Sequence, residues 1–247
     1  MIARVLRILE LLQTKGAVRA LITWPKFSLA AYTIISRMKK TGVQPKTVID
    51  VGANVGQFAI ASSRLFEDVT IYSIEPDPRV AKRLRKNLGP EMARNMRVSA
   101  IGDNVGTAMF NVNHDRQVSS LLPLGADRIE SFPDSRVVEQ ISVPVSTLDE
   151  LFGESVVLQE PILLKLDVQG FEDRVIAGAE KFLGRVQWVL MEVSFSTLYE
   201  GERDFEIIVG MMKCRGFRFV RPVNFHVSPK TREIIEMDAL FEVESRF

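Results

Sequence analysis

The stretch VIDVGANVGQF, residues 48–58, decides the fold of this chain. It begins with a short, β-branched apolar run that is typical of a strand covered on both faces. Gly52 and Gly56 follow, and they leave out side chains where a loop turns into a helix. A ligand can therefore approach the backbone N–H groups at the helix N-terminus. Asp50 adds a carboxylate to the apolar run, so the pattern indicates a strand–loop–helix ligand site with a negative charge beside it.

Outward from this stretch, short apolar runs alternate with helix patterns. One helix has clear ends, since Asp77 and Pro78 are typical of a helix start and Gly89 of a stop. The predicted strands are 47–51, 69–75, 96–101, 161–168 and 186–193, and the predicted helices are 54–66, 77–89, 172–183 and 202–216. The alternation predicts a mainly parallel sheet between helix layers, with ligands at the carboxyl ends of its strands.

Two segments depart from this alternation. Residues 102–147 form an insertion in which short strands flank a polar loop. Near the C-terminus, the runs 217–220 and 237–243 are close enough in sequence to pair as antiparallel strands. We therefore expect the sheet to end in an antiparallel hairpin.

Acidic residues occur where the predicted strands end. They are Asp50, Glu75, Asp103, Asp167 and Glu192. The carboxyl ends of parallel strands share one edge of a sheet, so these carboxylates are expected to gather there. Glu75 lies 19 residues beyond Gly56, where an acidic residue accepts both hydroxyls of a ribose in nucleotide sites.

The loop fits a dinucleotide poorly. A dinucleotide fold needs a central glycine to admit the pyrophosphate, whereas here Asn54 takes that place and the third glycine is missing. Asp50 would repel a pyrophosphate, but it would attract the ammonium group of an amino acid. An adenosine joined to an amino acid, without phosphate, satisfies both ends of the site. An NAD-dependent oxidoreductase is therefore a disfavoured alternative.

S-adenosylmethionine is such a ligand, and at these residues the chain resembles the FkbM family of class I S-adenosylmethionine-dependent methyltransferases. The resemblance runs from Thr47 to the C-terminus and rests on VIDVGANVGQF, SIEPDP, AIGDNVGT, VPVSTLDEL and LLKLDVQGFEDRVIAGA, in the family's order. It implies a Rossmann-like α/β sandwich whose seven-stranded, mainly parallel sheet has an antiparallel last strand. The family usually has glutamate where this chain has Gln169, which puts an acidic role of this position in doubt.

The predicted cofactor is S-adenosylmethionine. The residues predicted to bind it are Asp50, Gly52, Asn54, Gly56, Glu75, Asp103 and Asp167. The resemblance places Asp167 at the methionine part of the donor, where it would hold the ammonium, bind the acceptor or do both. The alternative is that Asp167 only caps the helix that follows.

Methyl transfer to a hydroxyl requires alignment of the acceptor and removal of its proton. Asp167 is the first candidate for this catalytic role. His114, in the inserted loop, is the second, because an unperturbed histidine titrates near ~6.5; otherwise it is an exposed loop residue. Glu172 and Glu192 are candidates for binding the acceptor.

Other polar residues give weaker signals. His226 is expected in the hairpin turn at the surface, and Ser119 and Ser120 would either bind ligand or be solvated. Three of the acidic residues offer oxygen ligands suited to Mg²⁺, but no tight ligand set occurs. No metal is therefore expected.

Composition suggests a basic head and an acidic body. The chain has 247 residues, of which 46% are apolar, enough to bury one ordinary core. Residues 1–46 contain nine Lys or Arg against one acid, whereas the remainder contains 23 against 30. We expect a basic N-terminal helical extension over 1–46 and a methyltransferase domain over 47–247. Since the body is acidic and no nucleic-acid reading module is recognisable, no nucleic-acid partner is expected.

The head is apolar as well as basic. Its charges interrupt the run of roughly 18–20 apolar residues that a spanning helix needs, and they are too dispersed for a secretory signal. Two interpretations remain. The helices either lie on an anionic membrane surface or cover the sheet or the substrate cleft.

The expected function is O-methylation of a hydroxyl on a sugar, glycolipid or secondary metabolite, as the resemblance implies. The alternative from another class is a non-catalytic binding protein on the same fold. Cys214 is the single cysteine and cannot form an internal disulfide, which fits a reducing compartment or a protein indifferent to redox state. We expect the protein in the cytoplasm, and at a membrane surface if its N-terminal helices bind one. The partner is expected to be a small-molecule or glycan acceptor, and the sequence does not indicate the oligomeric state.

Overall fold

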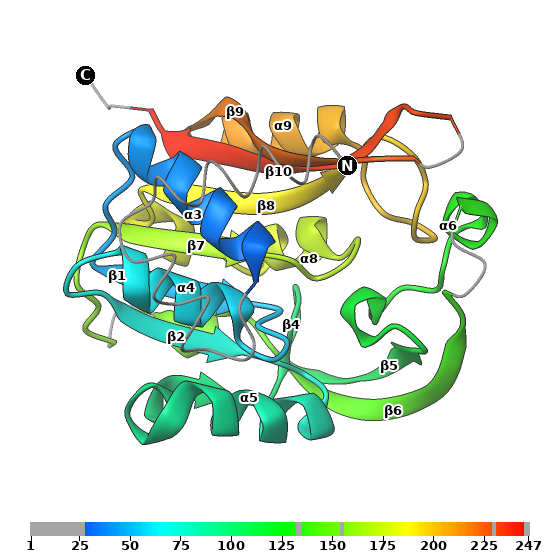
Figure 1. Cartoon of the computed structure of the whole chain (residues 1–247), viewed down its shortest axis with the longest axis horizontal. Coiled ribbons are helices and arrows are strands. Elements are labelled where there is room, and N and C mark those ends of the chain that lie inside the picture. Colours follow the sequence, from blue (N-terminus) through cyan, green and yellow to red (C-terminus); the bar gives the residue numbers. More distant parts are fainter. Residues whose placement is uncertain (1–27, 132–134, 154–155, 229–230, 245–247) are drawn as a thin grey trace.

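The computed structural model describes residues 28–131, 135–153, 156–228 and 231–244. A seven-stranded sheet forms its centre, in the order β3–β2–β1–β7–β8–β10–β9 (Figure 1). The strands are β1 (Thr47–Val51), β2 (Thr70–Ile74), β3 (Met96–Arg97), β7 (Ile162–Leu166), β8 (Trp188–Ser194), β9 (Phe217–Val227) and β10 (Ile234–Val243). Neighbours pair in parallel except β10, which runs antiparallel to β8 and β9. The predicted sheet and its antiparallel hairpin are confirmed.

Helices cover both faces of this sheet (Figure 1). One layer contains α3 (Leu29–Lys40), α4 (Gln57–Leu65) and α5 (Pro78–Met92), and the other contains α7 (Leu148–Phe152), α8 (Glu172–Ala177) and α9 (Phe205–Cys214). Alternate residues of a strand face opposite layers. Val48 packs in the core under the first layer and Ile49 in the core under the second, and both side chains are fully buried.

The start of α5 follows its sequence signals. The Asp77 side chain accepts a hydrogen bond of 2.8 Å from the backbone N–H of Arg79, and Pro78 occupies the first helical position. At the other end, Gly89 leaves helical geometry with φ 74°, as its sequence predicts. One further turn then carries the element to Met92.

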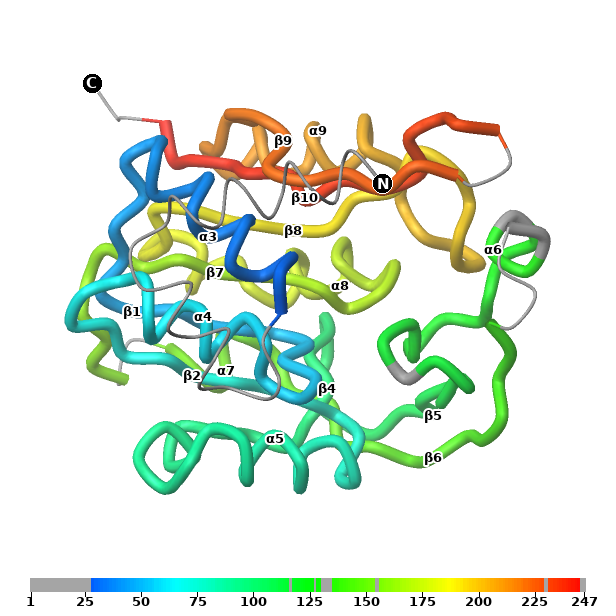
Figure 2. Tube along the Cα trace, in the orientation of Figure 1, coloured from blue at the N-terminus to red at the C-terminus, as the bar shows by residue number. Residues whose placement is uncertain are grey.

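A second, three-stranded sheet is built largely from the insertion. Its strands are β4 (Ala100–Ile101), β5 (Gly106–Asn113) and β6 (Val137–Ser146), in the order β4–β6–β5. The single strand predicted over 96–101 is therefore wrong, because the chain leaves the main sheet after Arg97 and joins the second sheet at Ala100. Figure 2 follows the insertion from β5 through α6 (Ala126–Ser131) to β6, beside the carboxyl ends of the main strands.

Helix α3 is part of the main core. Tyr32, Ile35 and Met38 are almost completely buried, in the same apolar cluster as α4 and the sheet. Arg37 Nη1 also donates a hydrogen bond of 2.7 Å to the carbonyl of Val223 in β9. Residues 29–40 thus form a layer over the sheet, as one of the two interpretations expected, and do not fold separately from it. Residues 1–27 lie outside the described residues.

None of the helices in the described ranges is long and apolar enough to span a bilayer.

Candidate active site

A cavity of about 510 Å³ opens at the carboxyl ends of the parallel strands. It lies where the strand order reverses between β1 and β7, the usual ligand position in open α/β sheets. The loop after β1, the ends of β2, β7 and β8, the start of α3, the inserted loop and the β9–β10 hairpin all contribute to its lining. Its size suits a ligand as large as a nucleoside with an attached amino acid.

The two glycines of the first loop have different roles. Gly52 lines the cavity, has φ 75°, and leaves no room for a Cβ, which would lie 1.9 Å from the carbonyl oxygen of Asp167. Gly56 does not line the cavity. A Cβ there would lie 2.9 Å from Leu84 Cδ1, so this glycine permits α4 to pack against α5. The prediction that Gly56 lets a ligand approach is wrong, whereas Asn54 lines the cavity as expected.

Glu75 is fixed by two backbone donors at the end of β2. Its Oε2 accepts 2.9 Å from the N–H of Asn54, and its Oε1 accepts 3.0 Å from the N–H of Asp77. Burial raises the pKa of Glu75 to about 7, although these two hydrogen bonds oppose the shift. Each carboxylate oxygen still has a lone pair for a further donor. The residue lines the cavity, so its two oxygens can accept the two hydroxyls of a ribose.

The charge of Asp50 is paired with a lysine of the protein and does not face a ligand. Its side chain is completely buried, and Lys165 Nζ lies 3.1 Å from its Oδ1 and 3.3 Å from Asp167 Oδ2. Burial opposes the charge on Lys165, but the carboxylates of Asp167 and Asp50 outweigh it and raise the pKa of this lysine. Asp50 does not line the cavity, so the prediction that it attracts the ammonium of the ligand is wrong. Lys165 takes that cationic position.

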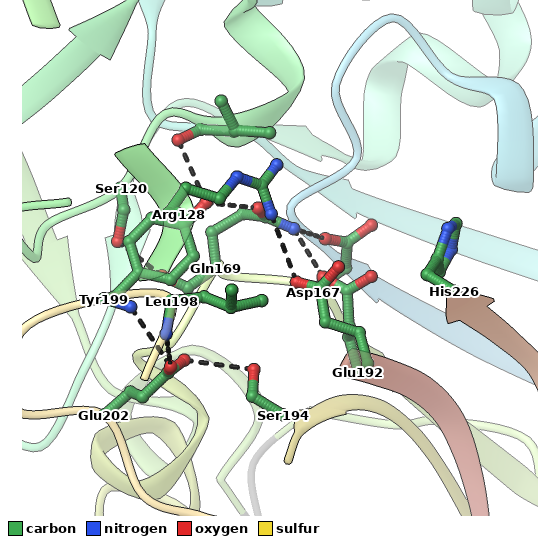
Figure 3. A network of polar contacts seen from close by, with 12 residues as sticks. Ser120, Arg128, Asp167, Gln169, Glu192, Ser194, Leu198, Tyr199, Glu202 and His226 are labelled. Atoms are coloured by element: carbon green, nitrogen blue, oxygen red, sulfur yellow. Dashed lines mark hydrogen bonds and ion pairs between the residues drawn. The ribbon is translucent and has the colours of Figure 1, made fainter. Parts of the chain in front are cut away.

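Asp167 reaches the cavity between two partners. Its Oδ2 faces Lys165, and its Oδ1 accepts 2.8 Å from Gln169 Nε2. The same nitrogen donates 2.6 Å to Glu192 Oε2, so one amide joins the two carboxylates (Figure 3). The Asp167 side chain is 40% exposed and lines the cavity, as its predicted role requires.

The far wall of the cavity is acidic. Glu192, Glu236 and Asp238 line it, and burial raises the pKa of each, that of Glu236 to about 7. The neighbouring acids raise the pKa of Glu192 further. Opposing positive charge comes from Arg128, whose Nη1 lies 3.4 Å from Glu236 Oε1. Glu192 lines the cavity, and its role in acceptor binding stays a prediction.

Besides Asp50 and Gly56, three further predicted site residues lie away from the cavity. Asp103 pairs with Arg174 at 3.0 Å, and Glu172 accepts 3.0 Å from the N–H of Val168. Burial raises the pKa of Glu172 to about 8, but its carboxylate closes the turn after β7 and does not face a ligand. His114 is exposed and outside the lining. The predicted roles of Asp103 in cofactor binding, Glu172 in acceptor binding and His114 in catalysis are not supported.

Sequence reasoning missed several lining residues. They are Lys165, Arg128, Asn224, His226, Glu236 and Asp238. His226 was expected in a surface turn, but β9 extends to Val227 and carries this imidazole to the cavity, beyond Asp167 and Glu192 in Figure 3. Only Lys165 had a usable sequence signal, since a lysine inside an apolar strand requires a buried partner.

The two serines of the inserted loop differ in their position relative to the cavity. Ser119 lines the cavity, whereas Ser120 is buried and its hydroxyl donates 2.6 Å to the carbonyl of Gln169. No group of three or more His, Cys, Asp or Glu residues in the described ranges is arranged to hold a metal ion.

The lining fits S-adenosylmethionine part by part. Glu75 fits the ribose, and Ser99, Ile101 and Phe171 form an adjoining part of the wall with a largely apolar character suited to adenine. The backbone of Gly52 and the Lys165–Asp167 pair lie where an amino acid with both charges would bind. These residues would hold the methyl donor.

Comparisons with known proteins agree with this assignment. A family model described as "Methyltransferase FkbM domain" matches residues 50–219. The 2-O-methyltransferase NoeI of Sinorhizobium fredii is 29% identical over 171 residues, which cover 67% of this chain and 70% of the relative. The 31-O-demethyl-FK506 methyltransferase FkbM of Streptomyces tacrolimicus is 24% identical over 196 residues, covering 70% and 73%.

The precorrin-6y C5,15-methyltransferase of Geobacter metallireducens aligns with a TM-score of 0.45 at 14% identity, covering 86% of this chain and 87% of that chain.

Proposed function

Because the chain belongs to the FkbM methyltransferase family, we propose that it transfers the methyl group of S-adenosylmethionine to a hydroxyl of a sugar, glycolipid or secondary metabolite. The family match supports a methyltransferase over both alternatives, a non-catalytic binding protein on the same fold and an NAD-dependent oxidoreductase. The names of two relatives, a 2-O-methyltransferase and a 31-O-demethyl-FK506 methyltransferase, support oxygen as the methylated atom.

One observation carries the proposal: the charge of the cavity. Among the described residues, six carboxylates and two permanent cations line it. With two cations against six carboxyl groups, this lining gives the phosphates of a dinucleotide little positive charge to bind, and its ionised carboxylates favour a donor that carries a positive charge. Carboxylates are also good acceptors for the several hydroxyl donors of a sugar.

The protein residues supply orientation and a place for the proton. The bound donor would supply a methyl group already activated for displacement, so the acceptor hydroxyl must be aligned and deprotonated. Asp167 would accept a hydrogen bond from that hydroxyl, because Lys165 and Gln169 fix the orientation of its carboxylate. His226 replaces His114 as the second candidate base, since it lines the cavity and His114 does not.

The proposal is tested by following transfer of a labelled methyl group to a panel of acceptors. The panel contains hydroxylated sugars, glycolipids and polyketides, with amines and thiols of similar size as controls. We expect labelled methyl ethers only, and a loss of turnover of at least tenfold in Asp167→Asn. Labelling confined to the amines or thiols, or full activity of Asp167→Asn, would contradict it.

We also propose that the first helix layer rests on an anionic membrane. Helices α3, α4 and α5 contain nine Lys or Arg and one acid, whereas α7, α8 and α9 contain two against five. On α5, the side chains of Lys82, Arg83, Arg85 and Lys86 are exposed and form no ion pair with any described acid. Such a face suits the anionic lipids of a cytoplasmic leaflet.

The chain outside the described residues favours lipid as the partner. Residues 1–27 are both apolar and basic, and they join the described chain at Ser28, which lines the cavity. A membrane bound at this end would bring a lipid-linked acceptor close to the site. We therefore propose that the protein works at the cytoplasmic surface of a membrane.

Liposome flotation tests this contact. Three proteins are compared: the full chain, a chain that starts at Ser28, and the full chain with Lys82, Arg83, Arg85 and Lys86 all changed to Gln. A start after α3 is avoided because that helix is part of the core. We expect flotation with phosphatidylserine vesicles, at least tenfold weaker in both variants, and none with neutral vesicles. Equal recovery of all three proteins would contradict the contact. Binding of RNA by the full chain, without any binding to the vesicles, would contradict it as well.

A further inference from the structure

The turn after β7 has an unusual backbone. Gln169 has φ 59° and Gly170 has φ 92°, so two consecutive residues are left-handed. This conformation is unfavourable for a residue with a side chain, and it persists only where surrounding contacts impose it. Ser120 Oγ donates 2.6 Å to the carbonyl of Gln169. A Cβ at Gly170 would lie 2.9 Å from Tyr199, so the buried tyrosine packs directly on the turn.

The side-chain amide of Gln169 has every hydrogen-bonding group in use. Its Nε2 donates 2.8 Å to Asp167 Oδ1 and 2.6 Å to Glu192 Oε2. Its Oε1 lies 2.5 Å from the hydroxyl oxygen of Tyr199. Figure 3 shows the amide at the centre of this group, with the two carboxylates on one side and the tyrosine on the other.

The neighbouring side chains determine which of its two flipped orientations the Gln169 amide adopts. If it were flipped, its oxygen would face the Asp167 carboxylate, and acceptors without a proton repel one another. In the observed orientation, the Tyr199 hydroxyl donates to Oε1, the nearer of two acceptors, the other being the carbonyl of Val118 at 3.1 Å. Arg128 lies over the Tyr199 ring at 5.9 Å and helps to hold the ring in place.

We propose that Gln169 is the positioning residue of this active site, holding Asp167 and Glu192 in one mutual orientation toward the acceptor. This rests on the proposed function. Asp167 lies on the donor side of the cavity and Glu192 on the acidic far wall, so the amide joins the two halves. Through Ser120 and Tyr199 the same turn also connects the inserted loop to the site.

A side-chain amide can donate hydrogen bonds to both Asp167 and Glu192 and accept one from Tyr199 without adding charge at this position. A carboxylate of the same length would keep the acceptor for Tyr199 but would place a third acidic group between Asp167 and Glu192. The charged and titratable groups around this position are Lys165 on β7, Asp167 directly after β7, Glu172 on α8, Glu192 on β8, Tyr199 and Glu202 in the loop after β8, Arg128 on α6, and Glu236 and Asp238 on β10. Acids outnumber cations, so Glu at position 169 would bind a proton strongly.

The test compares Gln169→Glu with wild type in thermal unfolding at several pH values. Below the ordinary glutamate pKa of about 4.3, the new side chain is protonated in both folded and unfolded protein. As pH rises, the unfolded chain ionises first and the folded state is progressively destabilised. We expect a small Tm deficit at pH 5, a clearly larger deficit at pH 8, and no pH-dependent difference in the control Gln159→Glu, whose position is exposed.

A second set of variants separates positioning from structure. Tyr199→Phe keeps the ring that packs on Gly170 and removes only the hydroxyl, and Gln169→Leu removes the amide. We expect both to bind S-adenosylhomocysteine within threefold of wild type. Turnover of an acceptor identified by labelling should fall at least tenfold with little change in the donor KM. A crystal structure of Gln169→Leu should show Asp167 and Glu192 in altered rotamers.

The outcomes distinguish this inference from the proposed function. The stability measurement needs neither donor nor acceptor, so failure of S-adenosylhomocysteine to bind wild type would overturn the function alone. A Gln169→Glu deficit that is absent, or that is equal at pH 5 and pH 8, would overturn the positioning role. Unchanged carboxylate rotamers and full turnover in Gln169→Leu would overturn it as well.

Discussion

Replacing Lys165 by methionine tests the charge arrangement beneath the site. Lys165 is 8% exposed and is the cation between the fully buried Asp50 and the partly exposed Asp167. Methionine keeps an unbranched side chain of similar length, and its sulfur suits the Phe58 ring, whose centroid is 5.8 Å from the lysine nitrogen. The change therefore removes the charge with little loss of packing.

The expected effect follows from burial and distance. Removing one partner of a buried ion pair leaves the other charge uncompensated and costs about 3–5 kcal/mol. Burial already raises the pKa of Asp50, and Lys165 opposes that shift. Without the lysine, Asp50 keeps its proton to higher pH in the folded protein. The stability deficit should thus be smallest below the ordinary aspartate pKa of about 3.9 and should grow as pH rises above it.

Urea unfolding followed by tryptophan fluorescence measures this effect. Asp50→Asn added to Lys165→Met should restore at least half of the lost free energy of unfolding, because it removes the unpaired charge. Lys82→Met is the control, since that side chain is exposed and should change stability by no more than about 0.5 kcal/mol. A Lys165→Met deficit below about 1 kcal/mol would refute the reasoning, as would a double variant less stable than the single one.

Three further predictions follow from the site geometry. Affinity for S-adenosylhomocysteine should weaken as pH falls below about 7, since the ionised Glu75 carboxylate is the better ribose acceptor; calorimetry giving equal affinity at pH 6 and pH 8 would contradict this. Gly56→Ala should lower the free energy of unfolding by about 1–3 kcal/mol, because the φ of 95° at this position and the side chain of Leu84 exclude a Cβ. Donor affinity should stay within threefold of wild type. A folded variant that has lost donor affinity would show that Gly56 belongs to the ligand site. His114→Gln should leave labelled-methyl transfer unchanged, and a tenfold loss would restore its catalytic role.

The sequence was sufficient where local chemistry determines the structure. The Asp77–Pro78 start of α5 is predictable because the cap involves only neighbouring residues. Glu75 was also placed correctly, since the strand before it and the loop at Gly52 fix which edge of the sheet it occupies. The antiparallel hairpin followed from the short separation of two apolar runs.

The sequence was insufficient where roles depend on register or packing. Asp50 and Lys165 are direct partners in the β1–β7 register, which no local pattern specifies. The role of Gly56 depends on how closely α4 approaches α5. His226 reaches the cavity because β9 continues to Val227 by pairing with β10, well past the apolar run that predicted it.

Calorimetric titration with S-adenosylhomocysteine and with NAD tests the central claim, that this acidic cavity holds a phosphate-free adenosyl donor. The account predicts micromolar binding of S-adenosylhomocysteine and none of NAD. Glu75→Ala should weaken the former by at least tenfold, because charge-assisted hydrogen bonds worth about 1.5–3 kcal/mol are lost. Binding of NAD in preference to S-adenosylhomocysteine, or of neither, would contradict the account.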